Sequence, residues 1–490
     1  MTIEVIGYIV FLLGAFGIVL GARFAIAVLC LSVLFGAAAA IQLPSLGGSS
    51  IQPSHLLLFS LIACCMLRPR LIQQALASAA YPGPGFWFAG YILFSVLSAF
   101  FLPRIFQGAT LVYSSARGAS GVMSTIASPL SPGSSNLTQA VYLLSDLACF
   151  AVVCGLAQLG HARFLAQTLV MTAVTCFALA SLDVGTFMAG QPEWLDFIRN
   201  ANYTMHTAET MSGFKRIVGS YPEASAYGSA ALAYFAFTLM LWLECFPSRL
   251  AGFAALSIGV TILLCTSTTA YIAGALVLLA VIAFSLNQLV AGRTTTRHAA
   301  FLSVTLFVVP AAVIGLMLIP DAWNAVNDLA SLTLIDKLES QSGEERTAWN
   351  TLALTAFVET ATFGGGLGTV RASSFPAALL SNIGVAGTVL FLVFLHSLLN
   401  AARSKKLPER PDRTIEDRTI GLAAIFASMA QIASATVSAS GTDLGLLFSI
   451  TAGLAAGCLT RPGASREWFA QPHLSWTSAS LTTLPVLVSR

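Results

Sequence analysis

Apolar residues form long, nearly unbroken runs along this chain, and polar residues gather in the intervals between the runs. A helix needs about 20 mostly apolar residues to cross the hydrocarbon core of a bilayer. Thirteen runs come close to that length, and each predicts a transmembrane helix. They lie near residues 3–21, 24–43, 52–67, 84–103, 138–159, 164–185, 222–245, 250–267, 269–291, 299–319, 376–400, 418–438 and 442–460. The pattern predicts an all-α, polytopic integral membrane protein with about thirteen transmembrane helices.

The polar intervals divide the predicted helices into sections. We expect ten transmembrane helices before the longest interval and three after it. The sections are residues 1–319, with loops at 104–137 and 186–221; residues 320–375, the large loop; residues 376–460, with a basic linker at 401–417; and the tail 461–490. Function resides in loops more often than in the scaffold that they connect, so we expect the chemistry in the three long loops.

Lysine and arginine residues predict which loops share a side, because basic residues are retained on the cytoplasmic side of a membrane. With thirteen spans and the N-terminus outside, sixteen of the 24 basic residues fall on the cytoplasmic side. The other eight are Arg104, Arg117, Arg199, Lys215, Arg216, Lys337, Arg346 and Arg371. The three long loops then lie outside, and the C-terminus lies in the cytoplasm.

Composition excludes several classes of protein. Charged residues make up 9% of the chain, whereas about 25% of the residues of a soluble domain are charged, so a soluble enzyme is excluded. The net charge of +3 is too small and too dispersed for a nucleic-acid partner. The nine cysteines lie in or beside apolar runs, without the paired spacing of a zinc site or a disulfide framework. They therefore indicate no metal site.

The end of the second outer loop brings two cations close to a predicted helix start. Lys215 and Arg216 are followed by Gly219, and then by the run Tyr221-Pro222-Glu223. Proline is favoured at the first helical position, because its missing N–H would have no partner there. We therefore expect a helix to begin at Pro222, with the Glu223 carboxylate in its first turn, beside the positive end of the helix dipole.

The third outer loop predicts a helix and then a tight turn. Ser342-Gly343-Glu344-Glu345 matches a capping box, and apolar residues follow at helical spacing from Trp349 to Phe357. We expect this amphipathic helix to lie on the membrane surface, with Arg346 near its start. The glycine-rich run 363–368 predicts a flexible turn that brings Arg371 against a substrate or the membrane.

The two loop ends share a pattern of arginine, small residues and an aromatic residue followed by proline at a helix start. An arginine beside a helix N-terminus suits phosphate oxygens, through its charge and through the unpaired N–H groups of the first turn. A single outer arginine also suits a simpler task, the anchoring of a helix to lipid headgroups. The repetition of the pattern favours a phosphate-bearing ligand.

The sequence resembles the O-antigen polymerase and O-antigen ligase superfamily of bacterial envelope glycosyltransferases. The resemblance is topological over most of the chain and motif-level in residues 215–227 and 342–390. The motifs are Arg216-x-x-Gly219-x-x-Pro222-Glu223-x-Ser225, Arg346-x-x-Trp349, Phe363-Gly364-x-Gly366-Leu367-Gly368 and Ser381-Asn382-x-Gly384-x-x-Gly387. It implies a multi-helix membrane fold of the GT-C class, located in the bacterial inner membrane, with a large periplasmic loop over the site.

The resemblance also implies a donor and a division of roles. The donor is an undecaprenyl-diphosphate-linked oligosaccharide held in membrane lipid, used without a cofactor or metal. The expected catalytic residues are Arg216, Arg346 and Arg371, which stabilise the leaving diphosphate, with Glu223 and Glu209 as candidate general bases. The expected substrate-binding residues are Lys215, His206 (a third candidate base), Tyr221, Gly366, Gly368 and Trp349.

One departure from the pattern favours a polymerase over a ligase. The ligase branch has a histidine late in the large loop, and residues 320–375 contain none. The run Arg371-Ala-Ser-Ser is closer to exopolysaccharide polymerases. Ligase-type transfer to another acceptor stays an alternative, and so does a flippase for lipid-linked glycans, although the predicted spans lack the serial charges of a transporter. A chain-length regulator is a further partner that the resemblance allows.

Overall fold

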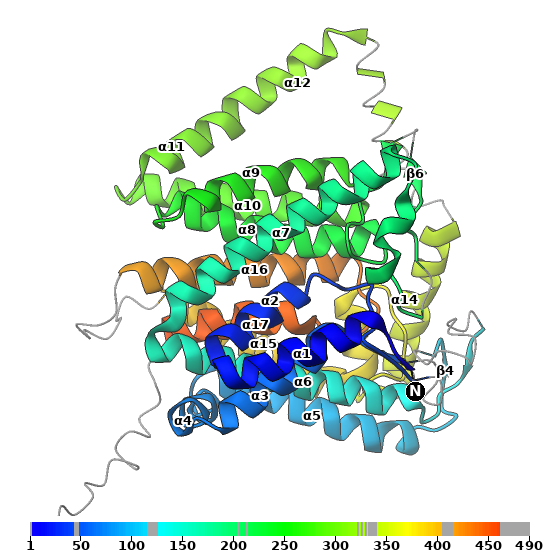
Figure 1. Ribbon diagram of the computed structural model, residues 1–490. Coiled ribbons are helices and arrows are strands. Elements are labelled where there is room, and N and C mark those ends of the chain that lie inside the picture. The colour runs from blue at the N-terminus through cyan, green and yellow to red at the C-terminus, as the bar shows by residue number, and fades with distance from the viewer. Residues whose placement is uncertain are drawn as a thin grey trace, which may run out of the picture.

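The protein is almost entirely helical in a computed structural model (Figure 1). The structure describes residues 2–43, 49–114, 126–202, 205–211, 214–320, 323–324, 327–328, 331, 341–403 and 415–460. Within this part of the chain the strands are two or three residues long and form no closed sheet. The predicted all-α class is confirmed. Arg117, Lys337, most of the linker 401–417 and the tail 461–490 lie outside the described residues.

The helices follow the predicted apolar runs. The first half of the chain contains α1 (Val5–Leu20), α2 (Ala22–Ser32), α3 (Pro53–Met66), α4 (Pro69–Ala77), α5 (Pro84–Ile105), α6 (Ser134–Leu156) and α7 (Ala162–Met188), with a 3-10 helix at Pro192–Ile198. The second half contains α8 (Ala224–Leu243), α9 (Arg249–Leu264), α10 (Thr268–Val290), α11 (Thr296–Ser303), α12 (Val309–Met317), α14 (Gln341–Glu359), α15 (Phe375–Arg403), α16 (Ile415–Val437) and α17 (Gly445–Leu459).

The short strands lie in the segments that connect these helices. They are β1 (Thr2–Ile3), β2 (Ile41–Leu43) and β3 (Ser49–Ile51) in one antiparallel sheet, and the antiparallel pairs β4 (Leu111–Val112) with β5 (Ser128–Pro129) and β6 (Thr210–Met211) with β7 (Phe214–Lys215). An isolated bridge joins Ser114 to Val370, so the first long loop is connected to the third.

The number of membrane crossings is smaller when only long helices are counted. Seven helical segments of the described chain are long and apolar enough to cross a membrane. Helices α3 and α4, which meet at a bend of 110°, add an eighth if the pair forms one span. One of the seven, Ser134–Met188, contains both α6 and α7, with a break at Gly160, where φ is 90°. The protein is therefore a polytopic membrane protein, and the number of thirteen spans stays a prediction.

The predicted helix 24–43 is wrong in its second half. Helix α2 ends at Ser32, and the chain that follows bonds to the second long loop. The backbone N–H of Ala37 donates to the carbonyl of Ser220 at 3.0 Å, and that of Ala39 donates to Asn200 Oδ1 at 2.9 Å. These tertiary hydrogen bonds replace the helical ones, although the residues involved are as apolar as those of a span.

Small residues allow the central helices to approach closely. Helix α16 packs between α8 and α17, and α17 packs against α6. A Cβ atom added at Gly453 or Gly457 of α17 would lie 2.7 Å from a backbone oxygen of α6, that of Phe150 or Cys154 respectively. Close backbone approach at small residues is the usual way in which transmembrane helices associate.

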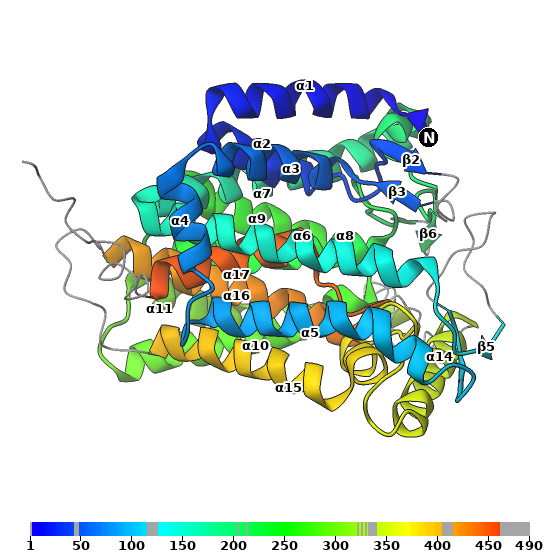
Figure 2. The ribbon, with the colours of Figure 1, turned by 90° about the horizontal axis from the view of Figure 1, so that it is seen from below.

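The long loops gather at one end of the helix bundle. In Figure 1 the labels β4, β6 and α14 lie at the right-hand end, together with the N-terminus. Helices α8 and α15 begin at this loop end and run to the opposite end, where α4 lies in Figure 2. Helices α11 and α12 diverge from the bundle in Figure 1, and only 6% of their most apolar window is buried.

Helix α14 begins at Gln341, within two residues of its predicted start, but its apolar residues do not all face a membrane. Ala353 and Ala356 are fully buried and pack in a small core with Val112, Leu130 and residues of α15. The apolar residues that predicted a helix on the membrane surface therefore pack α14 against the rest of the protein. Trp349 lies at the edge of this contact and is half-buried.

Candidate functional site

A buried carboxylate organises the end of the second long loop. Asp183, in the last turns of α7, is 1% exposed. Its Oδ1 accepts a hydrogen bond from Arg199 Nη2 at 2.7 Å, and its Oδ2 accepts from the backbone N–H groups of Val218 at 2.9 Å and Gly219 at 3.1 Å. Lys215 Nζ lies 3.5 Å from Oδ2. The loop is therefore anchored on the helix that precedes it.

Two buried cations share this one carboxylate. The side chains of Arg199 and Lys215 are 4% and 5% exposed. Lys215 Nζ also donates to the carbonyl oxygens of Thr207 at 2.6 Å and Arg216 at 2.8 Å. Burial lowers the pKa of Lys215, and the neighbouring Asp183 carboxylate opposes that shift only in part. An excess of positive charge is thus built into the base of the loop.

Arg216 is held by the candidate base Glu209. Its Nη1 lies 2.5 Å from Glu209 Oε2, and the backbone N–H of Arg216 donates to the carbonyl of Glu209 at 3.1 Å. The other carboxylate oxygen of Glu209 lies 2.6 Å from His206 Nδ1. A carboxylate placed between an arginine and a histidine orients them both. In this arrangement Glu209 and His206 hold the Arg216 guanidinium in position.

The helix after this loop begins two residues later than the sequence predicts. Helix α8 starts at Ala224, and Glu223 is its N-cap residue, with an extended backbone, so Pro222 is not the first helical residue. The Glu223 carboxylate accepts a hydrogen bond from the Ser225 hydroxyl. Tyr221 is buried, with its ring against Tyr227 at 6.2 Å between centroids. Its side chain therefore supports the loop and does not line its surface.

The glycine-rich run is a rigid, buried segment, so the expectation of a flexible turn is wrong. Gly364, Gly366 and Gly368 have φ angles of 85°, 96° and 77°, a region that residues with a side chain rarely adopt. A Cβ atom at Gly366 would lie 2.9 Å from the carbonyl oxygen of Ser98 and also against the ring of Pro103. Glycine is required here by backbone conformation and by close packing.

Two asparagine side chains fix the backbone of this run. Asn382 Oδ1 accepts from the N–H groups of Thr369 and Val370, each at 3.1 Å, and its Nδ2 donates to the carbonyl of Val370 at 2.8 Å. Asn136 Nδ2, from α6, donates to the carbonyl of Leu367 at 2.6 Å. Both side chains are buried. They take the place of the backbone partners that a regular helix or strand would supply.

Arg371 leaves this rigid segment and stacks on α14. Its Cζ lies 3.6 Å from the centroid of the Trp349 ring, and its backbone N–H donates to the carbonyl of Tyr113 at 2.8 Å. Asn350 Oδ1 accepts from the N–H of Ser373 at 2.8 Å. Stacking on an indole fixes the plane of a guanidinium group and is attractive by about 0.5–2 kcal/mol. The sequence did not indicate this contact between Arg371 and Trp349, which joins the end of the third loop to α14.

Arg346 occupies the same face of α14 as Trp349, because residues three apart lie one above the other on a helix. Its side chain is half-buried. Among the residues that the structure describes, it forms no hydrogen bond or ion pair. Its charge is available to a ligand on the side of α14 where Arg371 stacks.

The structure sorts the predicted site residues into two groups at the loop end. One group lies in the second long loop, which Asp183 anchors through Lys215, and contains Lys215, Arg216, Glu209, His206, Tyr221 and Glu223. The other is built on α14 and the glycine-rich run and contains Arg346, Trp349, Gly366, Gly368 and Arg371. The β6 and α14 labels of Figure 1 mark the two groups at the same end of the bundle.

Sequence reasoning missed the residues that support the site. Asp183 and Arg199 carry the first group, and Asn136 supports the second. The sequence did contain an indication of the role of Asp183. This acidic residue ends an apolar run, and several cations follow it in the next loop. Within the described chain, no group of three or more His, Cys, Asp or Glu side chains could hold a metal ion.

In comparisons with known proteins, this chain matches no family model and no curated protein. The resemblance to the polymerase and ligase superfamily therefore rests on the sequence motifs alone.

Proposed function

We propose that the protein is a polysaccharide polymerase of the bacterial inner membrane. It would transfer a growing glycan from undecaprenyl diphosphate onto a lipid-linked repeat unit at the periplasmic face. The observation that supports this proposal is the placement of fixed cations in the loops at one end of an apolar bundle. Arg371 precedes the first residue of α15 by four residues, and Arg216 precedes the first residue of α8 by eight.

The cations suit the leaving group of this reaction. The bond between the anomeric carbon of the donor glycan and the diphosphate oxygen breaks, and its electron pair stays on the diphosphate. Positive groups that are already oriented stabilise this developing charge without reorganisation. Arg371, stacked on Trp349, and Arg216, paired with Glu209, are oriented in this way. Arg346 would add a third cation on the side of α14.

The other half of the reaction needs a base. An oxygen of the acceptor sugar forms the new bond to the anomeric carbon, and its proton passes to a carboxylate or an imidazole. Glu209 and His206 are engaged with each other and with Arg216. Glu223 is half-buried at the start of α8 and accepts a hydrogen bond from Ser225. Glu223 is therefore our first choice for the general base.

Reconstitution with a purified lipid-linked repeat unit tests the proposal. Wild-type protein in liposomes should give a ladder of lengthened glycans, together with free undecaprenyl diphosphate. Loss of one oriented donor at a developing charge typically slows a reaction about 100- to 1,000-fold. Arg371→Ala and Arg216→Ala should therefore leave mainly single repeat units, although the protein still inserts.

Arg104→Ala is the matched control. Arg104 is an exposed arginine in the last turn of α5, outside both groups of site residues, and it donates to the carbonyl of Phe100. Its replacement should leave the ladder unchanged. A normal ladder from both Arg371→Ala and Arg216→Ala would contradict the site. Transfer only to a lipid A core acceptor would indicate a ligase, and movement of the repeat unit across the bilayer without a new bond would indicate a flippase.

A further inference from the structure

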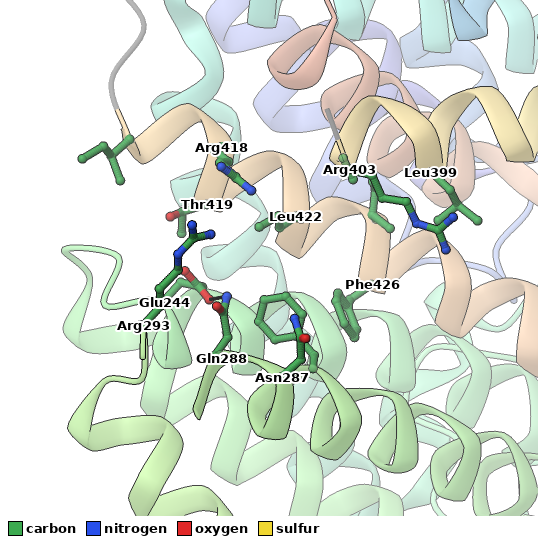
Figure 3. Close-up of a pocket in the computed structure, with 14 residues that line it drawn as sticks. Glu244, Asn287, Gln288, Arg293, Leu399, Arg403, Arg418, Thr419, Leu422 and Phe426 are labelled. Carbon is green, nitrogen blue, oxygen red and sulfur yellow. Dashed lines mark hydrogen bonds between the residues drawn. The ribbon is translucent and has the colours of Figure 1, made fainter. Parts of the chain in front are cut away.

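A cavity of about 610 Å³ opens at the end of the bundle opposite the loops. It lies where α8 and α10 end, between the last turns of α15 and the first turns of α16 (Figure 3). None of the residues that form the candidate site lines it. The cavity is therefore a separate feature of the molecule.

The lining combines an apolar wall with three arginines. The apolar part includes Phe284, Leu399, Leu422, Ile425 and Phe426. Arg403 and Arg418 come from α15 and α16 on one side of the cavity, and Arg293 follows α10 on the other side (Figure 3). Each guanidinium group carries a full positive charge at any physiological pH.

These arginines are not neutralised by the part of the protein that the structure describes. The side chains of Arg293, Arg403 and Arg418 form no hydrogen bond or ion pair with any described residue. Glu244 is the one acidic residue in the lining, and it lies 3.3 Å from His298 Nε2 and 3.4 Å from Gln288 Nε2. The charge of the lining is thus positive beside an apolar wall.

We propose that this cavity binds an anionic phospholipid of the surrounding bilayer. The phosphate would lie beside Arg293 and Arg418, which lie near each other in Figure 3, and Arg403, directed toward Leu399, would add a further cation to the lining. The first part of an acyl chain would lie against Phe426 and Leu422. A guanidinium group binds phosphate oxygens through two parallel hydrogen bonds. Basic pockets between transmembrane helices at the membrane interface suit lipid headgroups in this way. A free phosphate would satisfy the arginines but leave the apolar wall exposed to water.

Two features favour a lipid over a soluble ligand or a protein segment. The helix ends that surround the cavity place it at the level of the interface, where headgroups are concentrated. Its combination of dispersed cations and an apolar wall complements a molecule with one anionic end and one apolar end. The inference does not depend on the reaction proposed for the loop end.

A titration followed by native mass spectrometry tests the proposal with the full chain in detergent. The probes are dioleoyl phosphatidylglycerol and dioleoyl phosphatidylcholine. Each cation near a headgroup contributes roughly a factor of five in affinity. The triple variant Arg293→Gln, Arg403→Gln, Arg418→Gln should therefore bind phosphatidylglycerol roughly 10- to 100-fold more weakly than wild type. Its binding of phosphatidylcholine should stay unchanged.

Arg249→Gln is the matched control, because Arg249 begins α9 near the same end of the bundle and does not line the cavity. It should bind phosphatidylglycerol as wild type does. Equal affinity of the wild type for both lipids would overturn the proposal, and so would undiminished binding by the triple variant. Displacement of the lipid by glycerophosphoglycerol, the headgroup alone, would assign the site to a soluble phosphate ester and would also overturn it.

Discussion

The two ends of the helix bundle use arginine and lysine in different ways. At the loop end the cations are held by other parts of the protein: Arg199 and Lys215 by Asp183, Arg216 by Glu209, and Arg371 by the Trp349 ring. At the opposite end, three arginines line a partly apolar cavity, and their side chains have no hydrogen-bond or ion-pair partner among the described residues. The same residue types thus form a preorganised site at one end and a surface for an external anion at the other.

The few charges of this chain are thus divided between structure at one end and binding at the other. A cation that is fixed before a substrate arrives needs no reorganisation during a reaction, but its buried partner then becomes essential to folding. A cation at an open cavity contributes little to folding and can be removed at little cost. Removal of a charge should therefore lower the free energy of unfolding strongly at the loop end and little at the opposite end.

The largest effect is expected from Asp183→Ala. It would leave Arg199 and Lys215 buried without a carboxylate, and the removal of one partner of a buried ion pair costs about 3–5 kcal/mol. Because domains are stable by only about 5–15 kcal/mol, we expect poor expression and a much lower thermal midpoint in detergent. Arg403→Gln, at the opposite end, should change the free energy of unfolding by no more than about 0.5 kcal/mol. Similar midpoints for the two variants would remove the contrast between the ends.

Gly366→Ala should come next, with a loss of about 2–4 kcal/mol. The added methyl group meets the Pro103 ring, and the φ angle of 96° is strained for alanine. The control is Gly185→Ala, because Gly185 lies within α7 and has open space around its Cβ position. Alanine is the better helix former, so that variant should be as stable as wild type or slightly more stable. Thermal unfolding of both variants would show whether the loop end depends on its glycines.

Much of the fold was predictable, because apolar runs of span length leave few alternatives to helices. The failures have a common cause in tertiary contacts, which are hydrogen bonds in one segment and apolar packing in another. Residues 33–43 are apolar enough for a span, but Ala37 and Ala39 bond to the second long loop. Likewise, the spacing along α14 indicated an apolar face, but it did not reveal that Ala353 and Ala356 would pack on the protein.

In the candidate site, the cations and Glu209 could be predicted from the sequence, but the supporting residues Asp183 and Asn136 could not. The local pattern of residues located Arg216 and Arg371 in the loop ends that lead into helices, but it did not indicate that Arg371 would stack on Trp349. The link between Arg199 and Asp183 spans sixteen residues, and that between Asn136 and Leu367 spans 231. Contacts of this kind depend on how the helices pack, and a single sequence carries no periodic signal for them.

A smaller effect is expected where the loop end uses an aromatic ring in place of a carboxylate. Trp349→Leu keeps an apolar side chain but removes the stack with Arg371, which is worth about 0.5–2 kcal/mol. If Arg371 acts on the donor as proposed, the polymerisation rate should fall roughly 2- to 30-fold, and Trp349→Phe should restore part of it. Trp194→Leu is the control, because Trp194 is an exposed residue of the second long loop. A wild-type rate for Trp349→Leu would show that the stack does not position Arg371 for the reaction.

The smallest effect concerns pH and the buried amine of Lys215. Burial lowers its pKa below the ordinary 10.5, so between the lowered value and 10.5 the unfolded chain binds more protons than the folded chain. The free energy of unfolding contributed by this group therefore rises with pH across that window, by at most about 1.4 kcal/mol per pH unit. As the pH rises toward 10.5, wild type should gain stability relative to both Lys215→Met and Lys215→Arg, because neither variant titrates there. Lys215→Arg retains a cation beside Asp183 and should be the more stable of the two variants. Parallel profiles of unfolding free energy against pH for all three proteins would show that the amine is not buried as described.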